Sequence, residues 1–135
     1  MNTVQIIAFT HRQFNFDEIG LFHLDDKQRI DILTNLKTNL DIDELMYLST
    51  CNRVEFIVSH EKKITKTFVE KLIKQLLADQ LPVNLKDIVD RAEIINSKAA
   101  VHHIFSVASS IDSLVVGERE IITQVRKAFE EYLLN

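Results

Sequence analysis

The stretch Glu44-Leu-Met-Tyr-Leu-Ser-Thr-Cys-Asn-Arg-Val-Glu-Phe-Ile-Val-Ser-His60 decides the fold of this chain. Two strand-like runs, Glu44 to Ser49 and Val54 to Ser59, are separated by the four residues Thr50 to Arg53. Asparagine is a favoured turn residue, and Asn52 lies in the middle of this short connection. The pattern therefore predicts a β-hairpin with Cys51 at its tip.

The segment before the hairpin predicts one strand and one helix. Val4 to Phe9 is an apolar run typical of a buried strand, and His11 to Leu24 is irregular. Asp25 and Gln28 have the spacing of a capping box, which predicts that a helix begins at Asp25. Its apolar positions recur at helical spacing, at Ile30, Leu33, Leu36 and Leu40.

The segment after the hairpin repeats this order. Thr65 is a suitable cap for a helix with a broad apolar stripe, and Pro82 closes that segment. A weaker strand is expected within Ile88 to Ile95. The resulting β-α-β-β-α-β order predicts an α+β fold of the ferredoxin-like type.

Two further helices are expected after this domain. Ser97 can cap the first, and the second begins near Gly117-Glu118. The apolar stripe of the second helix is still running at Asn135, so we expect this last helix to be truncated.

Composition narrows the class of protein. A length of 135 residues suits one domain, and 46% hydrophobic with 27% charged residues is typical of a globular chain. Only two glycines and one proline are present, which argues against an all-β barrel. No apolar run reaches the roughly 20 residues of a membrane span, and no signal peptide is recognisable. With a single cysteine, we expect a cytoplasmic protein.

Cys51 is the first candidate for chemistry. A lone cysteine is most often a small buried hydrophobic residue. Here it lies in a predicted turn between Thr50 and Asn52, where a thiol can meet a substrate. The adjacent guanidinium of Arg53 would stabilise a thiolate, which is the nucleophilic form.

The histidines and the other polar positions allow two interpretations. No pair of histidines has the spacing and cysteine company of a zinc site. His103 lies at the edge of an apolar helical stripe. It is either a boundary residue of the core or an acid/base group that faces Cys51. The series Lys62, Lys63, Lys66, Lys71 and Lys74 suggests a solvated helix face, or more weakly an RNA contact.

Three segments of the chain resemble motifs of one known family. Ser49-Thr-Cys-Asn-Arg-Val-Glu55 is similar to the signature S-T-C-N-R-x-E. Residues 99–118, continuing to 128, resemble the block A-V-x-H-L-F-x-V-A-S-G-L-D-S-x-V-L-G-E-P-Q-I-L-G-Q-V-K-x-A. Ala8-Phe-Thr-His-Arg12 is similar, over a shorter length, to G-x-N-H-K. The three motifs and their order along the chain are those of the glutamyl-tRNA reductase family, which this sequence therefore resembles.

The resemblance implies roles for individual residues. Cys51 would be the nucleophile, and His103 matches a histidine that influences activity. The other matched positions would contact the substrate: Thr50, Asn52, Arg53, Ser113, Glu118, Arg119, Glu120 and Gln124. Arg119-Glu120 replaces the family's Pro-Gln, and Thr10 stands where the family has Asn before His11.

The resemblance also implies an activity and partners. The family takes glutamyl-tRNA, forms a thioester on cysteine and reduces it with NADPH to glutamate-1-semialdehyde for tetrapyrrole synthesis. Residues 1–135 would be the single N-terminal catalytic domain of such an enzyme. The family's enzymes continue into an NADPH-binding domain and a helical domain that forms a homodimer, and the resemblance implies that both would be absent from this chain. Gly20 and Gly117 form no glycine-rich phosphate turn, so we expect no NADPH site of that type here. No membrane partner is implied.

A non-catalytic reading belongs to a different class. Ferredoxin-like modules also bind small molecules or RNA without catalysis, and the fold alone does not decide. In that case Cys51 would be structural and resist alkylation, whereas a catalytic thiol would react quickly near neutral pH.

Overall fold

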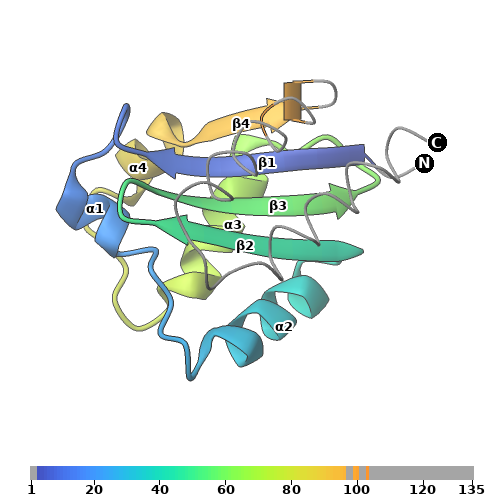
Figure 1. Cartoon of the computed structure of the whole chain (residues 1–135), viewed down its shortest axis with the longest axis horizontal. Helices are drawn as coiled ribbons and strands as arrows, with labels where there is room; N and C mark the ends of the chain where they lie inside the picture. Colours follow the sequence, from blue (N-terminus) through green and yellow to red (C-terminus); the bar gives the residue numbers. More distant parts are fainter. Residues whose placement is uncertain (1–2, 97–98, 101–102, 104–135) are drawn as a thin grey trace. The chain divides into compact units, whose positions relative to one another are not determined.

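The computed structural model describes residues 3–96, 99–100 and 103 (Figure 1). The chain divides into two units, Met1–Asn96 and Ser97–Asn135, and the elements below belong to the first. In chain order they are β1 (Thr3–Thr10), α1 (Phe16–Gly20), α2 (Arg29–Asn39), β2 (Glu44–Thr50), β3 (Arg53–His60), α3 (Lys66–Leu76), α4 (Leu85–Arg91) and β4 (Glu93–Asn96). No helix in the described ranges is long and apolar enough to cross a membrane.

The four strands form one antiparallel sheet in the order β2-β3-β1-β4. This confirms the predicted α+β class and the hairpin of β2 and β3. β1 lies in the middle because its run from Ile6 to Thr10 is buried on both sides of the strand. The sheet in Figure 1 shows β1 between β3 and β4.

Alternation along the strands gives the sheet two different faces. Directly paired residues share a face, and successive residues point to opposite faces. The first face carries Ile7, Phe9 and Phe56, which join the core cluster with apolar residues from all four described helices. The second face carries Ile6 and Ala8 together with polar side chains near the hairpin tip.

The first face is closed by aromatic packing. The rings of Phe9 and Phe22 stack with centroids 3.9 Å apart, and Phe56 meets Phe9 edge-on. The Tyr47 hydroxyl donates to the Phe22 carbonyl and accepts from the Leu24 amide, both at 3.0 Å. These contacts fix the segment after α1 against β2.

Two predictions around the helices were wrong. The segment predicted to be irregular contains α1, whose capping box pairs Asn15 with Glu18. Asp25 does not begin a helix; α2 starts at Arg29 with no side-chain cap, and the Asp25 carboxylate accepts from the Lys27 amide instead. A helix of five residues has too few turns to show periodicity.

The second half holds one confirmation and one correction. The Thr65 hydroxyl accepts from the Phe68 amide at 3.3 Å, which confirms the predicted cap of α3. The weaker strand is shorter than predicted, because Ile88 to Arg91 belongs to α4 and only Glu93–Asn96 is β4. The predicted truncated helix and the cap at Ser97 lie outside the described residues.

Candidate active site

The turn between β2 and β3 holds Cys51 at the surface. The pairing of Thr50 with Arg53 closes the hairpin, so Cys51 and Asn52 form its two-residue tip. The cysteine is free and exposed. The Thr50 hydroxyl accepts from the Asn52 amide at 3.3 Å, and the Asn52 carbonyl accepts from the His11 amide at 3.1 Å. The tip is therefore held from both sides, with its thiol open to solvent.

A polar row crosses the second face of the sheet beside this tip. Arg53 pairs with Thr50 on β2 and with Thr10 on β1, so the three side chains point to the same face. The Arg53 side chain is 23% exposed. The next row of the same face contains Glu55, which is 1% exposed. Thus the row beside Cys51 contains the guanidinium of Arg53 and the hydroxyls of Thr50, on the hairpin, and Thr10, on β1.

Arg53 and Glu55 form a loose ion pair. Arg53 Nη1 lies 3.6 Å from Glu55 Oε2, which is beyond normal hydrogen-bond length. Within the described part of the chain, no hydrogen bond of the Arg53 guanidinium is seen. Its five N–H donors match a carboxylate in a planar fork. The site can therefore hold an anionic group next to Cys51.

Arg91 forms a much tighter cluster next to the segment that follows β1. Its guanidinium donates to Glu18 and Asp87, and to the Gln13 carbonyl at 2.9 Å. It also lies 4.6 Å from the centre of the Phe14 ring. The hydrogen bonds from Arg91, helped by the Asn15 amide, lower the pKa of Glu18 from its ordinary 4.5 to about 2. The hydrogen bond with Glu18, and after it the one with Asp87, raises the pKa of Arg91.

One lysine of the series predicted to be a solvated face has a structural role. Lys66 Nζ donates to the carbonyls of Val89, Asp90 and Ala92, at 3.1 Å and 3.0 Å for the first two. These carbonyls lie at the end of α4, where helix carbonyls lack partners within the helix. Lys66 therefore caps α4 and is not available to RNA.

The structure brings together only part of the predicted site. Thr50, Cys51, Asn52 and Arg53 are neighbours on the hairpin. His103 is helical and half-buried, and it belongs to the second unit. The remaining predicted contacts lie outside the described residues: Ser113, Glu118, Arg119, Glu120 and Gln124.

Sequence reasoning missed two polar residues of the second face, Thr10 and Glu55. Both are buried, and both face the same side as Arg53. Glu55 carried a signal, because it is a charged residue between Val54 and Phe56 inside an apolar strand. Thr10 lies in the segment Ala8–Arg12 that the sequence singles out, but only the pairing of β1 with β3 places it beside Arg53.

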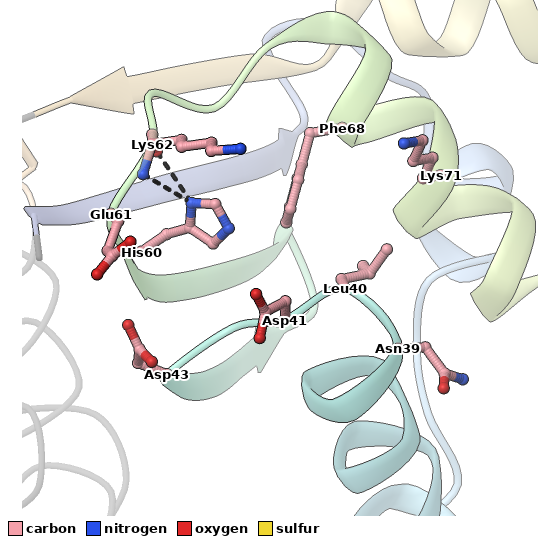
Figure 2. Close-up of a pocket in the computed structure, with 9 residues that line it drawn as sticks. All are labelled: Asn39, Leu40, Asp41, Asp43, His60, Glu61, Lys62, Phe68 and Lys71. Atoms are coloured by element: carbon pink, nitrogen blue, oxygen red, sulfur yellow. Dashed lines mark hydrogen bonds between the residues drawn. The ribbon is translucent and has the colours of Figure 1, made fainter.

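A separate cavity of about 360 Å³ opens at the far ends of β2 and β3 (Figure 2). His60 Nδ1 accepts from the Lys62 amide at 3.0 Å there, and the His60 and Phe68 ring centres are 5.4 Å apart. The lining includes both carboxylates and ammonium groups. The lining residues are Asn39, Leu40, Asp41, Asp43, His60, Glu61, Lys62, Phe68 and Lys71. It contains none of the predicted substrate contacts.

The described residues do not fit a dinucleotide cofactor. Among the described residues, glycine occurs only at position 20. Gly20 is the last residue of α1 and does not lie between a strand and the helix that follows it. A phosphate-binding turn needs several glycines between a strand and the helix that follows it. In the described ranges no group of three side chains could hold a metal ion.

Comparison with known proteins gives one consistent result. Residues 7–133 match the model of the family described as glutamyl-tRNAGlu reductase, N-terminal domain. The chain is 37% identical over 129 residues to a glutamyl-tRNA reductase of Nitratiruptor sp., covering 93% of this chain and 29% of that protein. It is 39% identical over 127 residues to the glutamyl-tRNA reductase of Campylobacter hominis, and the match covers 91% of this chain and 28% of that protein.

A solved structure is also similar. The glutamyl-tRNA reductase from Methanopyrus kandleri matches with a TM-score of 0.57 and 25% sequence identity. The match covers 98% of this chain and 29% of that one. The chain thus spans less than a third of the length of the relatives that it matches.

Proposed function

Because this chain belongs to the glutamyl-tRNA reductase N-terminal domain family, we propose that its function is acyl transfer from glutamyl-tRNA to Cys51. One observation carries the proposal: a free, exposed thiol lies at the tip of a hairpin, beside an arginine with open hydrogen-bond donors. A structural cysteine is buried, and this one is exposed. That favours catalysis over the non-catalytic binding module.

The chemistry needs only the thiolate and an activated acyl group. The Cys51 sulfur attacks the carbonyl carbon of the ester that joins glutamate to the terminal ribose. The carbon–oxygen bond to ribose breaks, a thioester forms, and the released ribose oxygen takes up a proton. An exposed thiol at a turn can reach such an ester, which a buried one could not.

Arg53 is proposed to select the glutamyl side chain. A guanidinium binds a carboxylate through two parallel hydrogen bonds, and Arg53 has donors left beyond its loose contact with Glu55. The carboxylate of Glu55 keeps the guanidinium on the second face of the sheet. We propose that Thr50 and Asn52 contact the same substrate from the tip.

The other predicted site residues remain proposals that rest on the resemblance alone. His103 is proposed to assist in proton transfer or in substrate positioning. Ser113, Glu118, Arg119, Glu120 and Gln124 are proposed to complete the substrate site.

We propose that the chain is the N-terminal catalytic domain of a longer cytoplasmic enzyme. Reduction of the thioester by NADPH, to glutamate-1-semialdehyde for tetrapyrrole synthesis, is assigned to the longer enzyme, since the residues that the structure describes do not fit a dinucleotide cofactor. We propose that the longer enzyme, through its helical domain, also forms the homodimer. We also propose that the fold is ferredoxin-like, which the strand order β2-β3-β1-β4 supports.

Mass spectrometry after brief exposure to glutamyl-tRNA tests the acyl transfer. We expect a glutamyl adduct on Cys51 that is labile to hydroxylamine and absent from Cys51→Ser. The measurement should be made on this chain and on the longer enzyme. Intact glutamyl-tRNA and unmodified Cys51 in both samples would contradict the proposal.

A further inference from the structure

The hydroxyl of Thr10 is buried without a partner. Thr10 is the last residue of β1 and is 3% exposed. Its Oγ1 makes no hydrogen bond in the described part of the chain. A buried hydroxyl is ordinarily hydrogen-bonded, because its desolvation is otherwise uncompensated. A buried hydroxyl without a partner is therefore explained either by a ligand that binds it or by a structural role of the residue.

The other polar side chains of β1 show that the strand can satisfy such groups. The Thr3 hydroxyl donates to the His60 carbonyl at 3.4 Å. Gln5 is buried like Thr10, but its amide donates to the Lys62 carbonyl at 2.8 Å and accepts from the Ile64 amide at 2.6 Å. Only at the Cys51 end of β1 is a buried polar side chain left open.

The position of Thr10 points to its ligand. Thr10 pairs directly with Arg53, so their side chains lie on the same face with Cβ atoms roughly 5 Å apart. Arg53 in turn pairs with Thr50, which precedes Cys51. A group held by the Arg53 guanidinium is therefore within reach of the Thr10 hydroxyl.

We propose that Thr10 is a substrate-binding residue whose hydroxyl donates a hydrogen bond to the glutamyl carboxylate held by Arg53. The inference rests on the proposed function. An anionic oxygen is the partner favoured beside a cation, and hydrogen bonds to charged groups are stronger than neutral ones. Substrate would thus satisfy a hydroxyl that the folded protein leaves unpaired.

Protection of Cys51 from iodoacetamide tests this contact. The probe is L-isoglutamine, the α-amide of glutamate, which carries the same carboxylate but no reactive ester. We expect it to slow alkylation of the wild-type chain. Thr10→Val keeps the shape and removes the hydroxyl, so half-protection should require roughly 10- to 100-fold more probe. Thr10→Ser, which keeps the hydroxyl, should protect nearly as well as wild type.

Thermal unfolding separates binding from structure. Thr10→Val removes an unpaired buried hydroxyl, so its unfolding midpoint should rise by a few degrees while binding weakens. A structural threonine would lower the midpoint on the same change. Thr3→Val, at the other end of β1, is the matched control and should leave protection unchanged.

Each outcome decides a different point. Wild-type protection with an equal response from Thr10→Val would overturn the role of Thr10 and leave the proposed function standing. A lowered midpoint in Thr10→Val would likewise assign Thr10 to the fold. No protection of wild-type Cys51 at any concentration of L-isoglutamine would contradict the proposed function itself, and the Thr10 contact with it.

Discussion

Arg53 and Arg91 both pair with carboxylates, but their surroundings differ. Arg91 donates to Glu18, Asp87 and a main-chain carbonyl, and it packs on the Phe14 ring. Arg53 has one loose contact of 3.6 Å with Glu55. Both side chains are about a quarter exposed, at 27% and 23% respectively. Solvent access alone therefore does not separate them.

The difference shows what each arginine can still do. An arginine whose donors are all engaged holds elements together, and Arg91 joins α4 to the segment around α1. An arginine with open donors can bind a ligand. Arg53 is the one that lies beside the free thiol. The comparison therefore assigns Arg91 to the fold and supports the proposed role of Arg53 in substrate binding.

Arg53→Lys should produce the largest effect. Lysine keeps the positive charge beside Glu55 but cannot present a planar fork, so acylation of Cys51 should slow roughly 100-fold. The free energy of unfolding should change little. The measurements are the adduct rate by mass spectrometry and urea denaturation. Unchanged acylation would place carboxylate recognition elsewhere.

Arg91→Met should reverse this pattern. The apolar stem is kept, while Glu18 and Asp87 lose their shared cation, so unfolding should cost about 2 kcal/mol less. The acylation rate per folded molecule should remain near wild type. Lys86→Met, exposed on the same helix, is the control and should stay within about 0.5 kcal/mol. Equal stability of both variants would remove Arg91 from its proposed role.

Acid should weaken the Arg91 cluster through Glu18. The pKa of Glu18 is about 2 in the folded protein and ordinarily 4.5, so the unfolded chain binds its proton first. The stabilisation is fully present above about pH 4.5 and is lost as the pH falls toward 2. Allowing for solvent screening, it should amount to about 1–2 kcal/mol.

Urea titrations across this pH range measure the effect. Glu18→Gln should flatten the acid limb of the stability curve, and Arg91→Met should flatten it by a similar amount. An acid limb that is unchanged in both variants would mean that other carboxylates cause it.

The smallest predicted effect compares two possible caps. Asn15→Ala removes the side chain that accepts from the Glu18 amide and should cost about 1 kcal/mol. Asp25 has the same spacing to Gln28 as Asn15 has to Glu18, but it caps no helix. Asp25→Ala should therefore change the free energy of unfolding by no more than about 0.5 kcal/mol. Thermal unfolding of the two variants measures the difference. A larger loss for Asp25→Ala would contradict the assigned start of α2.

These caps show where prediction from sequence fails. The apolar strand runs and the hairpin around Cys51 were predictable, because alternation and turn residues are local signals. The helices α1 and α4, with five and seven residues, are too short for a clear period. The spacing of a capping box occurs at Asn15 and again at Asp25, and local sequence does not tell which one begins a helix.

The part of the candidate site that consists of consecutive residues was predictable from the sequence. The part that strand pairing brings together from distant positions was not. Thr50 to Arg53 are consecutive, so the motif predicts them together. Thr10 reaches the same row only through the register of β1 against β3, which depends on the packing of the whole sheet. The open donors of Arg53 are likewise visible only when every other contact is known.

The choice between glutamyl-tRNA and glutaminyl-tRNA tests the central claim most directly. The two acyl groups have the same shape, but only the glutamyl group carries the carboxylate that Arg53 is proposed to bind. The rate of adduct formation on Cys51 should be measured with each by mass spectrometry. We expect glutamyl-tRNA to acylate Cys51 at least roughly 100-fold faster. Equal rates would show that Arg53 does not recognise the carboxylate of the glutamyl group.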